Sequence, residues 1–535
     1  MKSAAPNPDK DLYAQLRALP WDRLWNTEAA RFDAASPAER LAGVAVVRAV
    51  GVVFSESGPR EQRDRVRQWL LALLRDPCEK IRRYAITALP KIGAGPGEEA
   101  QLLSLLRATT LERERKYLAR TLEKIGGKAT LQTIQAGAPG LLPQTEQKIR
   151  ASVARAQSPS ALRMDRLLSD FAGLRIHLRG RRGLEGIVRQ EAEELIRARG
   201  KFRLAGVGPG LVALIPVAPF ALADIYALRC FGTVGFVPAA AEPARASSPS
   251  PPQTCGGEGR GEEVFIESMA YAITSPSSRR LLEAFTQGAI RYRLNFISKG
   301  HQRSLVRRLA DRVYALRPEI LNDARNVTWT FDIQPAGRGH AVELRPNVTP
   351  DPRFSWRLQD IPAASHPPLA ACLARLPGRV ENEIVWDPFC GSGSELVESA
   401  LLGGVRALYG TDRDPAAIAA ARANFASAGA KSVEMNLTCC DFRDFAAGGA
   451  LGHDRLTLIL TNPPLGRRVP LDDVHRLLED LFRVAAAVLR PGGRLVLANP
   501  LLMENPRPLL QLQSSQAVDF GGFDCRVELW RKPPR

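Results

Sequence analysis

The sequence predicts a multidomain protein of α and α/β class, with a helical solenoid first, an α+β part in the middle and a doubly wound sheet last. Three observations lead to this fold class. The chain has 535 residues, which is too long for a single hydrophobic core. The first part contains an internal repeat of helical character. The last part alternates strand-like and helix-like segments from about residue 364 onward.

The net charge is strongly positive. Lysine and arginine exceed aspartate and glutamate by 18, and the sequence pI is about 9.9. Such an excess predicts a polyanionic partner, most simply nucleic acid. A genome rich in G and C, which raises the arginine and alanine content everywhere, is the alternative. We favour nucleic acid because arginines also cluster locally.

The eight cysteines are scattered and form no C-x-x-C pair. This spacing argues against a zinc site and against a disulfide framework, and it suits a reducing compartment. The N-terminus lacks the apolar stretch of a secretory signal. Prolines and an aspartate interrupt the most apolar window, 211–228, too often for a membrane span. We therefore expect a cytoplasmic protein with no metal site and no membrane segment.

Residues 1–157 are expected to be helical, and they contain a repeat. Arg83-Tyr84-Ala85 recurs as Lys116-Tyr117-Leu118, and Leu89–Gly93 recurs as Leu122–Gly126, in both cases after 33 residues. A fixed period of this length is typical of stacked helical hairpins and resembles HEAT-type repeats. An ordinary helical bundle is the alternative. A helical repeat of this kind predicts a surface for a protein partner.

Residues 165–237 predict a small α+β domain. The expected order is strand, helix, strand and helix, at 174–178, 183–195, 208–214 and 219–229. Residues 238–262 are rich in Pro, Ala, Ser and Gly and have little to bury, so they predict a disordered linker.

Residues 263–348 predict a module that faces RNA. A strand at 291–296 precedes a basic helix at 301–316, and a hairpin follows at 327–333 and 340–344. The basic residues of this helix are Arg303, Arg307, Arg308 and Arg312. Contacts from Arg303 and Arg307 to RNA phosphates are one interpretation, and a solvated helix face is the other. Residues 350–362 are expected to form a linker.

The stretch 383–393 reads Glu-Ile-Val-Trp-Asp-Pro-Phe-Cys-Gly-Ser-Gly, a short strand that ends at a glycine turn before a helix. Gly391 and Gly393 let the backbone approach a ligand closely. The turn lacks the third glycine of dinucleotide sites. Asp387 at the strand tip would repel a pyrophosphate but suits an ammonium or sulfonium group. This favours S-adenosylmethionine over NAD as the cofactor.

Further acidic residues follow at the ends of the next two strands. Asp412 lies 21 residues after Gly391, the distance expected for a carboxylate that binds ribose hydroxyls. Asp414 precedes a proline, and we expect it to cap the next helix. Asp441 follows a third strand at 432–438 and is a candidate acceptor for the adenine amino group. A simple loop residue is the alternative for Asp441.

The fourth strand, 456–460, is followed by Thr-Asn-Pro-Pro-Leu-Gly. Two prolines cannot continue a sheet, so they fix a rigid turn at its C-terminal edge. There the side-chain oxygen of Asn462 and the carbonyl of Pro463 can both accept hydrogen bonds from one exocyclic amine, which orients its lone pair toward a methyl donor. A plain proline turn is the alternative. Arg467 and Arg468 are candidates for phosphate contacts, or are solvated charges.

The end of the chain completes the expected sheet. A helix at 473–489 leads through a Pro-Gly-Gly turn at 490–493 into a strand at 494–498. Two segments, 516–520 and 526–530, flank a Gly-Gly turn. We expect them to form a hairpin that closes the sheet edge.

Residues 364–535 resemble class I S-adenosylmethionine-dependent methyltransferases. D-P-F-C-G-S-G, from Asp387, matches their first motif, and N-P-P, from Asn462, matches their amino-methylating motif. The N-P-P-L-G-R-R continuation and the segment 364–369 are more closely similar to THUMP-associated RNA methylases that modify guanine N2 in transfer or ribosomal RNA. Residues 165–237 resemble the ferredoxin-like domain of that family, and residues 263–348 resemble its THUMP domain.

This resemblance implies a Rossmann-like methyltransferase sheet with S-adenosylmethionine as cofactor. The implied cofactor-binding residues are Asp387, Phe389, Gly391, Gly393, Asp412, Asp441 and Asn462, and the implied catalytic loop is Asn462, Pro463, Pro464 and Leu465. The chain departs from the family in two places. Leu465 stands where amino-methylases carry an aromatic residue, which forfeits roughly 1–3 kcal/mol of base stacking. The N-terminal helical repeat is also unusual in the family.

We therefore expect an RNA methyltransferase that acts on an exocyclic amine, most simply guanine N2 of transfer or ribosomal RNA. Two alternatives stay open. One is a DNA adenine-N6 methyltransferase, because N-P-P serves that amine equally well. The other is a catalytically weak RNA-binding or scaffold protein, which Leu465 and the helical repeat suggest.

Overall fold

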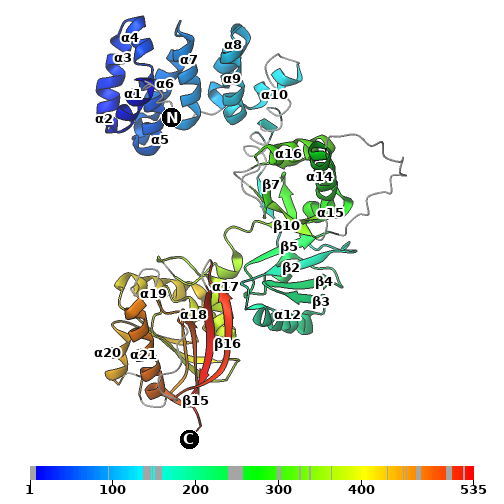
Figure 1. Ribbon diagram of the computed structural model, residues 1–535, viewed down its shortest axis with the longest axis vertical. Coiled ribbons are helices and arrows are strands. Elements are labelled where there is room, and N and C mark those ends of the chain that lie inside the picture. Colours follow the sequence, from blue (N-terminus) through cyan, green and yellow to red (C-terminus); the bar gives the residue numbers. More distant parts are fainter. Residues whose placement is uncertain are drawn as a thin grey trace.

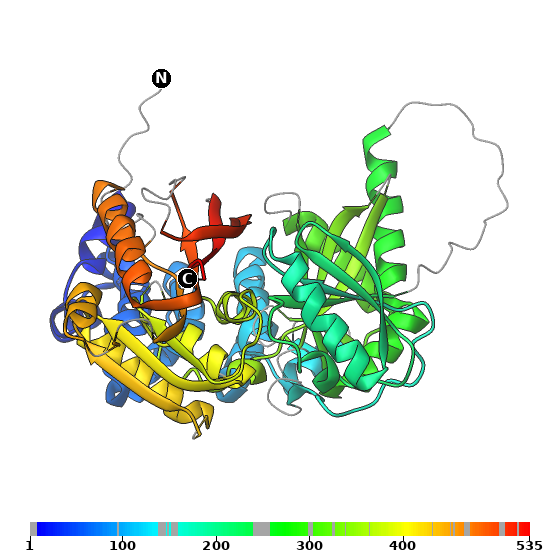
Figure 2. The ribbon, with the colours of Figure 1, turned by 90° about the horizontal axis from the view of Figure 1, so that it is seen from below.

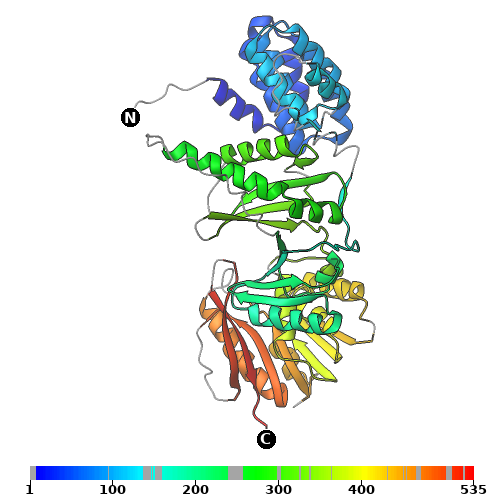
Figure 3. The ribbon, with the colours of Figure 1, turned by 90° about the vertical axis from the view of Figure 1, so that its right-hand side faces the viewer.

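The computed structural model has helices at one end, an α/β region next to them and a second α/β region at the other end, and part of the middle region lies beside the second one (Figures 1 and 3). The residues that the structure describes are 8–93, 96–136, 146, 149, 150, 153, 159–238, 257–297, 303–323, 327–336, 339–362, 364–430, 432–449, 451, 452, 455–464, 471–501, 509–521 and 524–534.

The first region consists of helices in its described part. These are α1 Pro8–Arg17, α2 Trp21–Arg23, η1 Leu24–Ala29, α3 Ala30–Ala34, α4 Pro37–Ala42, α5 Ala45–Ser57, η2 Arg60–Gln62, α6 Arg63–Leu73, α7 Glu79–Ala88, η3 Leu89–Ile92, η4 Pro96–Glu98, α8 Glu99–Ala108, α9 Glu112–Ile125 and α10 Lys128–Gln135. The two repeat units lie on α7 and α9, which pack together. Arg82 of α7 donates hydrogen bonds of 2.7 and 3.0 Å to the buried Glu114 carboxylate of α9. A buried ion pair thus joins the two units.

The middle region is built on one sheet of eight strands in the order β3-β4-β2-β5-β10-β9-β7-β8 (Figure 1). The strands are β2 Arg175–Arg179, β3 Phe202–Gly208, β4 Leu211–Pro216, β5 Thr233–Val237, β7 Ile290–Phe296, β8 Ile320–Asn322, β9 Trp329–Ala336 and β10 Gly339–Pro346. A separate pair is formed by β1 Ser160–Leu162 and β6 Thr286–Gly288. The sheet is continuous because β5 pairs with β10 at Phe236 and Leu344. The sequence predicts two separate domains here, 165–237 and 263–348, but their strands form one sheet.

Three expectations for the middle region are wrong in detail. The single strand expected at 208–214 is a hairpin of β3 and β4, because Gly210 has φ +67° and turns the chain. The helix expected at 219–229 is only α13 Leu222–Ile225. The expected linker 238–262 ends early, because α14 begins at Gly257. Ile266, Met269, Ala270 and Ile273 of α14 are buried at helical spacing, and this burial stabilises the helix.

The remaining helices of the middle region are α12 Glu185–Arg199, α14 Gly257–Thr274, α15 Pro276–Phe285 and α16 Arg303–Leu316. The expected helices at 183–195 and 301–316 thus correspond to α12 and α16. The expected hairpin corresponds to β9 and β10, which pair antiparallel from Gly339–Ala336 to Pro346–Trp329.

The C-terminal region is a doubly wound sheet in the order β13-β12-β11-β14-β15-β17-β16. Its strands are β11 Glu383–Asp387, β12 Val405–Asp412, β13 Glu434–Cys439, β14 Leu456–Thr461, β15 Leu489–Asn499, β16 Gln511–Asp519 and β17 Asp524–Arg531. Its helices are α17 Pro367–Arg375, α18 Ser394–Leu402, α19 Pro415–Ala428, α20 Phe442–Ala447 and α21 Leu471–Val488. The first five strands pair in parallel, and the expected hairpin, β16 with β17, closes the edge.

Alternation along the central strands buries both faces of this sheet. Val385 and Leu458 pack in the cluster that includes α17 and α18, whereas Trp386 and Ile459 pack in the cluster that includes α20 and α21. Side chains of successive strand residues point to opposite faces, so a sheet covered on both sides needs such continuous apolar runs. One expectation is wrong here, because 490–493 is part of β15. The Gly492 N–H donates to the Lys532 carbonyl at 2.9 Å and extends the pairing.

The middle and C-terminal regions lie side by side (Figure 2) and are joined by partly buried ion pairs. Arg229 donates two hydrogen bonds of 2.7 Å to Glu398 of α18, and Arg375 of α17 donates one of 2.7 Å to Glu194 of α12. The expected linker 350–362 lies at this joint. Its Arg353 is buried and donates to the Phe231 carbonyl at 2.7 Å.

Candidate active site

The two sequence motifs of the C-terminal region meet at the switch point of its sheet. From β11 the chain runs through β12 and β13 on one side, and it returns with β14 on the other side of β11. Val385 and Trp386 pair in parallel with Leu458 and Ile459, so both strands end at the same edge. In open α/β sheets this crevice is where ligands bind.

A buried carboxylate links the two strand ends. Asp387, the last residue of β11, is fully buried. Its Oδ1 accepts hydrogen bonds from the Thr461 hydroxyl at the end of β14 (2.6 Å) and from the Phe389 N–H (3.0 Å). No hydrogen-bond partner is recorded for Asp387 Oδ2 in the described part of the chain. A buried oxygen without a partner is costly, so this atom is suited to a ligand.

Asp412 accepts hydrogen bonds from the glycine loop and from the turn that follows β12. The Gly391 N–H donates to Asp412 Oδ2 at 3.0 Å, and the Asp414 N–H donates to Oδ1 at 2.9 Å. Gly391 and Gly393 have φ values of +52° and +79°, which other residues adopt at a cost. A Cβ on Gly393 would lie 3.0 Å from the Ala421 Cβ. The prediction that Asp414 caps the next helix is confirmed, since its side chain accepts from the Ala416 N–H at 2.8 Å.

Phe389 and Asp441 lie beside this loop. The Phe389 ring is 5.0 Å from the Phe442 ring, centroid to centroid. Asp441 caps α20, accepting from the Arg443 N–H at 2.9 Å and from its guanidinium at 3.0 Å. Its carboxylate therefore already has two protein donors, and an adenine amino group would share it with them.

Asn462 is oriented by a residue far away in the sequence. Its Nδ2 donates to the Ser365 hydroxyl at 2.8 Å, and its Oδ1 is buried with no recorded partner among the described residues. Pro463 is buried and Pro464 is exposed. The amide thus presents an acceptor, not a donor, at the sheet edge. Leu465, Arg467 and Arg468 lie outside the described residues.

Residues 355–518 match the model of the UPF0020 family, described as the RMKL-like methyltransferase domain. This stretch is a class I S-adenosylmethionine-dependent methyltransferase domain. It resembles the domain of THUMP-associated methylases, as expected from the two motifs.

Among curated relatives, the chain is 27% identical over 187 residues to the tRNA (guanine(10)-N2)-dimethyltransferase of Methanothermobacter thermautotrophicus, covering 35% of this chain and 50% of the relative. It is 31% identical over 171 residues to the tRNA (guanine(6)-N2)-methyltransferase of Thermus thermophilus, covering 31% of this chain and 49% of the relative. The chain thus spans about half the length of the curated relatives that it matches.

The fold has a counterpart among solved structures. The crystal structure of TrmN from Thermus thermophilus has a TM-score of 0.50 and 21% identity, over 67% of this chain and 99% of that one. This likeness shows the fold alone. The similar fold covers 67% of this chain, whereas residues 355–518 are less than a third of it. The shared fold therefore extends beyond the methyltransferase domain. The Rossmann-like fold that the sequence predicts is confirmed.

The methyltransferase domain places a second buried carboxylate beside the first. Glu395, in the first turn of α18, is buried and its Oε1 has no recorded partner among the described residues. Burial and then the nearby Glu395 raise the pKa of Asp387 well above its usual value. Burial raises the pKa of Glu395 as well, although its hydrogen bond with Ser365 opposes this.

These residues fit the cofactor. S-adenosylmethionine carries a sulfonium and an ammonium, and a cation beside two buried carboxylates offsets the cost of their ionisation. The orphaned Oδ2 of Asp387 and Oε1 of Glu395 are acceptors available for such a group. Gly391 and Asp412 would provide the close backbone approach and the carboxylate for the ribose.

Sequence reasoning missed the roles of Ser365 and Glu395. Ser365 stands just before the helix that carries the resemblance, and a hydroxyl next to an apolar helix start is also a common cap. From the sequence alone, Glu395 is an acidic residue in the first turn of a helix, and glutamates at such positions are common on protein surfaces. Only the fold shows that both side chains are buried at the switch point.

Arg303 and Arg307 lie away from this site. Both are exposed on α16, which Figures 1 and 3 place on the side of the middle region opposite the methyltransferase domain. Arg308 and Arg312 of the same helix pair with Glu262 and Glu267 of α14, at 2.9 and 2.7 Å. No ion pair is recorded for Arg303 or Arg307 within the described residues.

The described residues contain neither a metal-binding cluster nor a membrane-spanning helix. No group of three or more His, Cys, Asp or Glu side chains is placed there to hold a metal ion. None of the described helices combines the length and the hydrophobicity that a membrane span requires.

Proposed function

We propose that this chain is an RNA methyltransferase that methylates an exocyclic amine, most simply N2 of a guanine in transfer or ribosomal RNA. One observation carries the proposal. The Asn462 amide is fixed through its nitrogen by Ser365, while its oxygen is buried at the switch point without a recorded partner among the described residues. An amine N–H of a base is the donor that this oxygen lacks.

The residues of the loop act by orientation. Bound S-adenosylmethionine supplies an electrophilic methyl group. Asn462 Oδ1 and the Pro463 carbonyl accept the two N–H groups of the target amine, which aims its lone pair and stabilises the positive charge that develops on nitrogen. The two prolines hold the loop rigid, so little order is lost when the base arrives. No strong base is required, because the extra proton leaves from an already cationic nitrogen.

The substrate class is supported by charge and by the relatives. Both curated relatives are named as tRNA guanine-N2 enzymes. The net charge of +18 suits a polyanion. We propose that Arg303 and Arg307 contact RNA phosphates, and that Arg467 and Arg468 do so next to the target base. An exocyclic amine inside a duplex is out of reach, so the target nucleotide is unpaired or flipped.

The experiment compares modified nucleosides by mass spectrometry in total RNA from a deletion strain and its parent. The purified full chain is then incubated with RNA from the deletion strain and labelled S-adenosylmethionine. Asn462→Ala is expected to lower kcat by at least about 100-fold and to leave cofactor affinity within about twofold. Asn436→Ala is the matched control, because its amide donates only to the exposed Glu434 in the same sheet.

Three outcomes contradict the proposal. Normal methylation by Asn462→Ala would show that the site is misassigned. Transfer to adenine N6 of genomic DNA, without transfer to RNA, would favour a DNA methylase. Cofactor binding without turnover on any RNA would favour a scaffold.

A further inference from the structure

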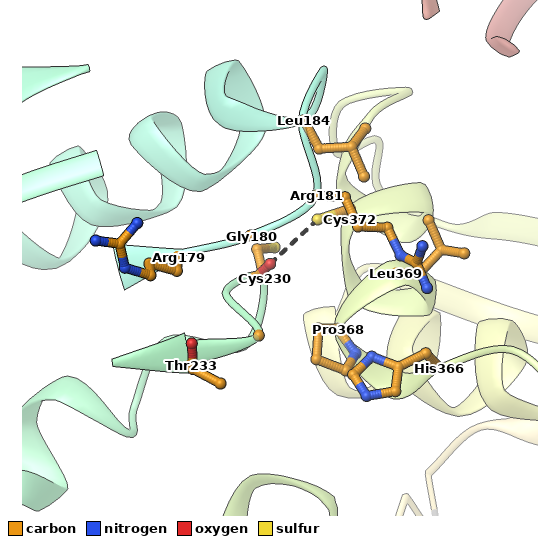
Figure 4. A pocket seen from close by; sticks show the side chains of 11 residues that line it. Arg179, Gly180, Arg181, Leu184, Cys230, Thr233, His366, Pro368, Leu369 and Cys372 are labelled. Atoms are coloured by element: carbon orange, nitrogen blue, oxygen red, sulfur yellow. Dashed lines mark hydrogen bonds between the residues drawn. The ribbon is translucent and has the colours of Figure 1, made fainter. Parts of the chain in front are cut away.

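A cavity of about 290 Å³ lies between the middle region and the methyltransferase domain (Figure 4). It is distinct from the crevice that holds the cofactor-binding residues. Residues from β2, α12 and β5 and their connections line one side, and residues at the start of α17 line the other. This volume is near the lower end of that found for small-molecule sites.

Most of the wall is apolar and firmly packed. Leu184 and Leu369 face the cavity from opposite sides and are buried. The Cys372 thiol donates to the Cys230 carbonyl at 3.4 Å, and this hydrogen bond is one of the contacts between the two regions. A wall of this kind suits a flat, largely apolar group such as a nucleobase or the face of a sugar.

Two arginines and one histidine line the cavity. Figure 4 shows Arg181 and His366 on the same side, with Arg179 on the other. Arg179 is neutralised by Glu343, to which its Nε donates at 2.8 Å. Arg181 donates to the Asp519 carbonyl at 2.9 Å and lies over the Phe520 ring, and no carboxylate partner is recorded for it among the described residues. Its charge therefore remains available for an anion.

The surroundings of His366 show the same excess of charge. Burial lowers the pKa of His366, and Arg181, Arg357 and Arg353 lower it further. Asp351 opposes this, but it ranks last among these causes. An uncharged imidazole at neutral pH leaves Arg181 as the main cationic group that lines the cavity.

The cavity is next to the catalytic loop. His366 directly follows Ser365, whose hydroxyl accepts the hydrogen bond from Asn462. An RNA strand whose target base is held at Asn462 therefore continues close to this cavity. A nucleotide next to a flipped base has lost one stacking neighbour, and an apolar pocket can replace that contact.

We propose that this cavity is a subsite for a nucleotide adjacent to the target nucleotide, with its base or sugar against the apolar part of the wall and its phosphate beside Arg181. The inference rests on the proposed function. It assigns a substrate contact to the interface between the middle region and the methyltransferase domain. A free nucleotide could bind this cavity in the same way as a nucleotide of the RNA substrate. The experiment below therefore distinguishes binding of RNA from binding of a free nucleotide.

Two variants change the cavity in different ways. Arg181→Ala removes the cation. Thr233→Trp fills the cavity from an exposed position in β5 whose side chain has no recorded hydrogen bond in the described residues. Arg189→Ala is the matched control, since Arg189 is an exposed arginine of the neighbouring α12 that lies outside the cavity. Thermal unfolding of each variant verifies that it is folded.

The measurements use RNA from a deletion strain with the full chain. Arg181→Ala and Thr233→Trp are each expected to raise KM for RNA by about tenfold. The kcat at saturating RNA and the calorimetric Kd for S-adenosylmethionine should stay within about twofold. Arg181→Ala should also lower the slope of log Kd against log salt by about one. Arg189→Ala should change KM by less than about twofold.

The results separate this inference from the proposed function. If the wild type transfers no methyl group to RNA, the proposed function fails. If the wild type is active and both cavity variants keep its KM, the subsite alone is wrong. The subsite is also wrong if free GMP alters wild-type turnover, Thr233→Trp abolishes that response, and KM for RNA is unchanged, because the cavity then binds a free nucleotide.

Discussion

Replacing Ser365 by alanine tests how the active site is oriented. The Ser365 hydroxyl is buried, lies 2.8 Å from Asn462 Nδ2 and is its recorded acceptor. Without it, the amide either leaves a buried N–H unsatisfied or rotates to find another partner. Rotation would turn the Asn462 oxygen away from the target amine. In both cases the acceptor at the sheet edge is no longer fixed.

The expected loss follows from the cost of one buried hydrogen bond. An unsatisfied buried donor costs about 1–3 kcal/mol. If this cost falls on the transition state, kcat drops by between about fivefold and about 150-fold. The KM for RNA should change by less than about twofold. The Kd for S-adenosylmethionine is measured separately, because the Ser365 hydroxyl also hydrogen-bonds Glu395.

The assay is steady-state methyl transfer to RNA from a deletion strain, together with calorimetric cofactor binding and thermal unfolding. Ser365→Thr keeps a hydroxyl and should recover most of kcat. Ser399→Ala is the control for loss of a buried hydroxyl, because the Oγ of Ser399 on α18 has no recorded hydrogen bond. An unchanged kcat in Ser365→Ala, or an equal loss in Ser399→Ala, would refute the orienting role.

Three further predictions concern neighbouring groups. Asp412→Ala should weaken S-adenosylmethionine binding by about 10- to 100-fold, since it removes the acceptor of the Gly391 N–H and the carboxylate that we propose for the ribose hydroxyls. Calorimetry measures this, and an unchanged Kd would contradict it. The raised pKa values of Asp387 and Glu395 mean that the ligand-free native state keeps protons that the unfolded chain loses above about pH 4. Stability should therefore fall as the pH rises above about 4, and Glu395→Gln should flatten that slope in urea unfolding; an equal slope in both proteins would be inconsistent with it. Arg229→Ala should destabilise the protein by about 3–5 kcal/mol, because it leaves the buried Glu398 charge unpaired. Denaturant unfolding at neutral pH measures this loss. A loss below about 1 kcal/mol would show that this ion pair contributes little to the interface between the two regions.

The middle region shows where sequence reasoning reaches its limit. The expected hairpin was read from local alternation and is present as β9 and β10. The pairing of β5 with β10 joins Phe236 to Leu344, and no local pattern encodes a partner so far along the chain. The stretch expected as a linker begins to form α14 at Gly257. Its composition there is that of a loop, and Ile266 is the first buried residue among the described side chains of the helix.

The sequence by itself determined the chemistry of the methyltransferase domain. Asp387, Gly391, Asp412 and Asn462 could be picked out because each follows a short apolar run at a characteristic spacing, and strand ends, turns and caps are set by neighbouring residues. The family match and the parallel sheet confirm the methyltransferase domain and its fold, and the roles of these four residues stay predictions.

Only the tertiary structure decided which of these groups meet and how they are oriented. The strand order places β14 beside β11 and so brings Thr461, the residue before Asn462, into a hydrogen bond with Asp387. Ser365, 97 residues before Asn462, fixes the amide, and the cavity beside His366 forms only where two regions pack. Such contacts depend on burial and on hydrogen bonds between distant segments, which leave no periodic signal along the chain.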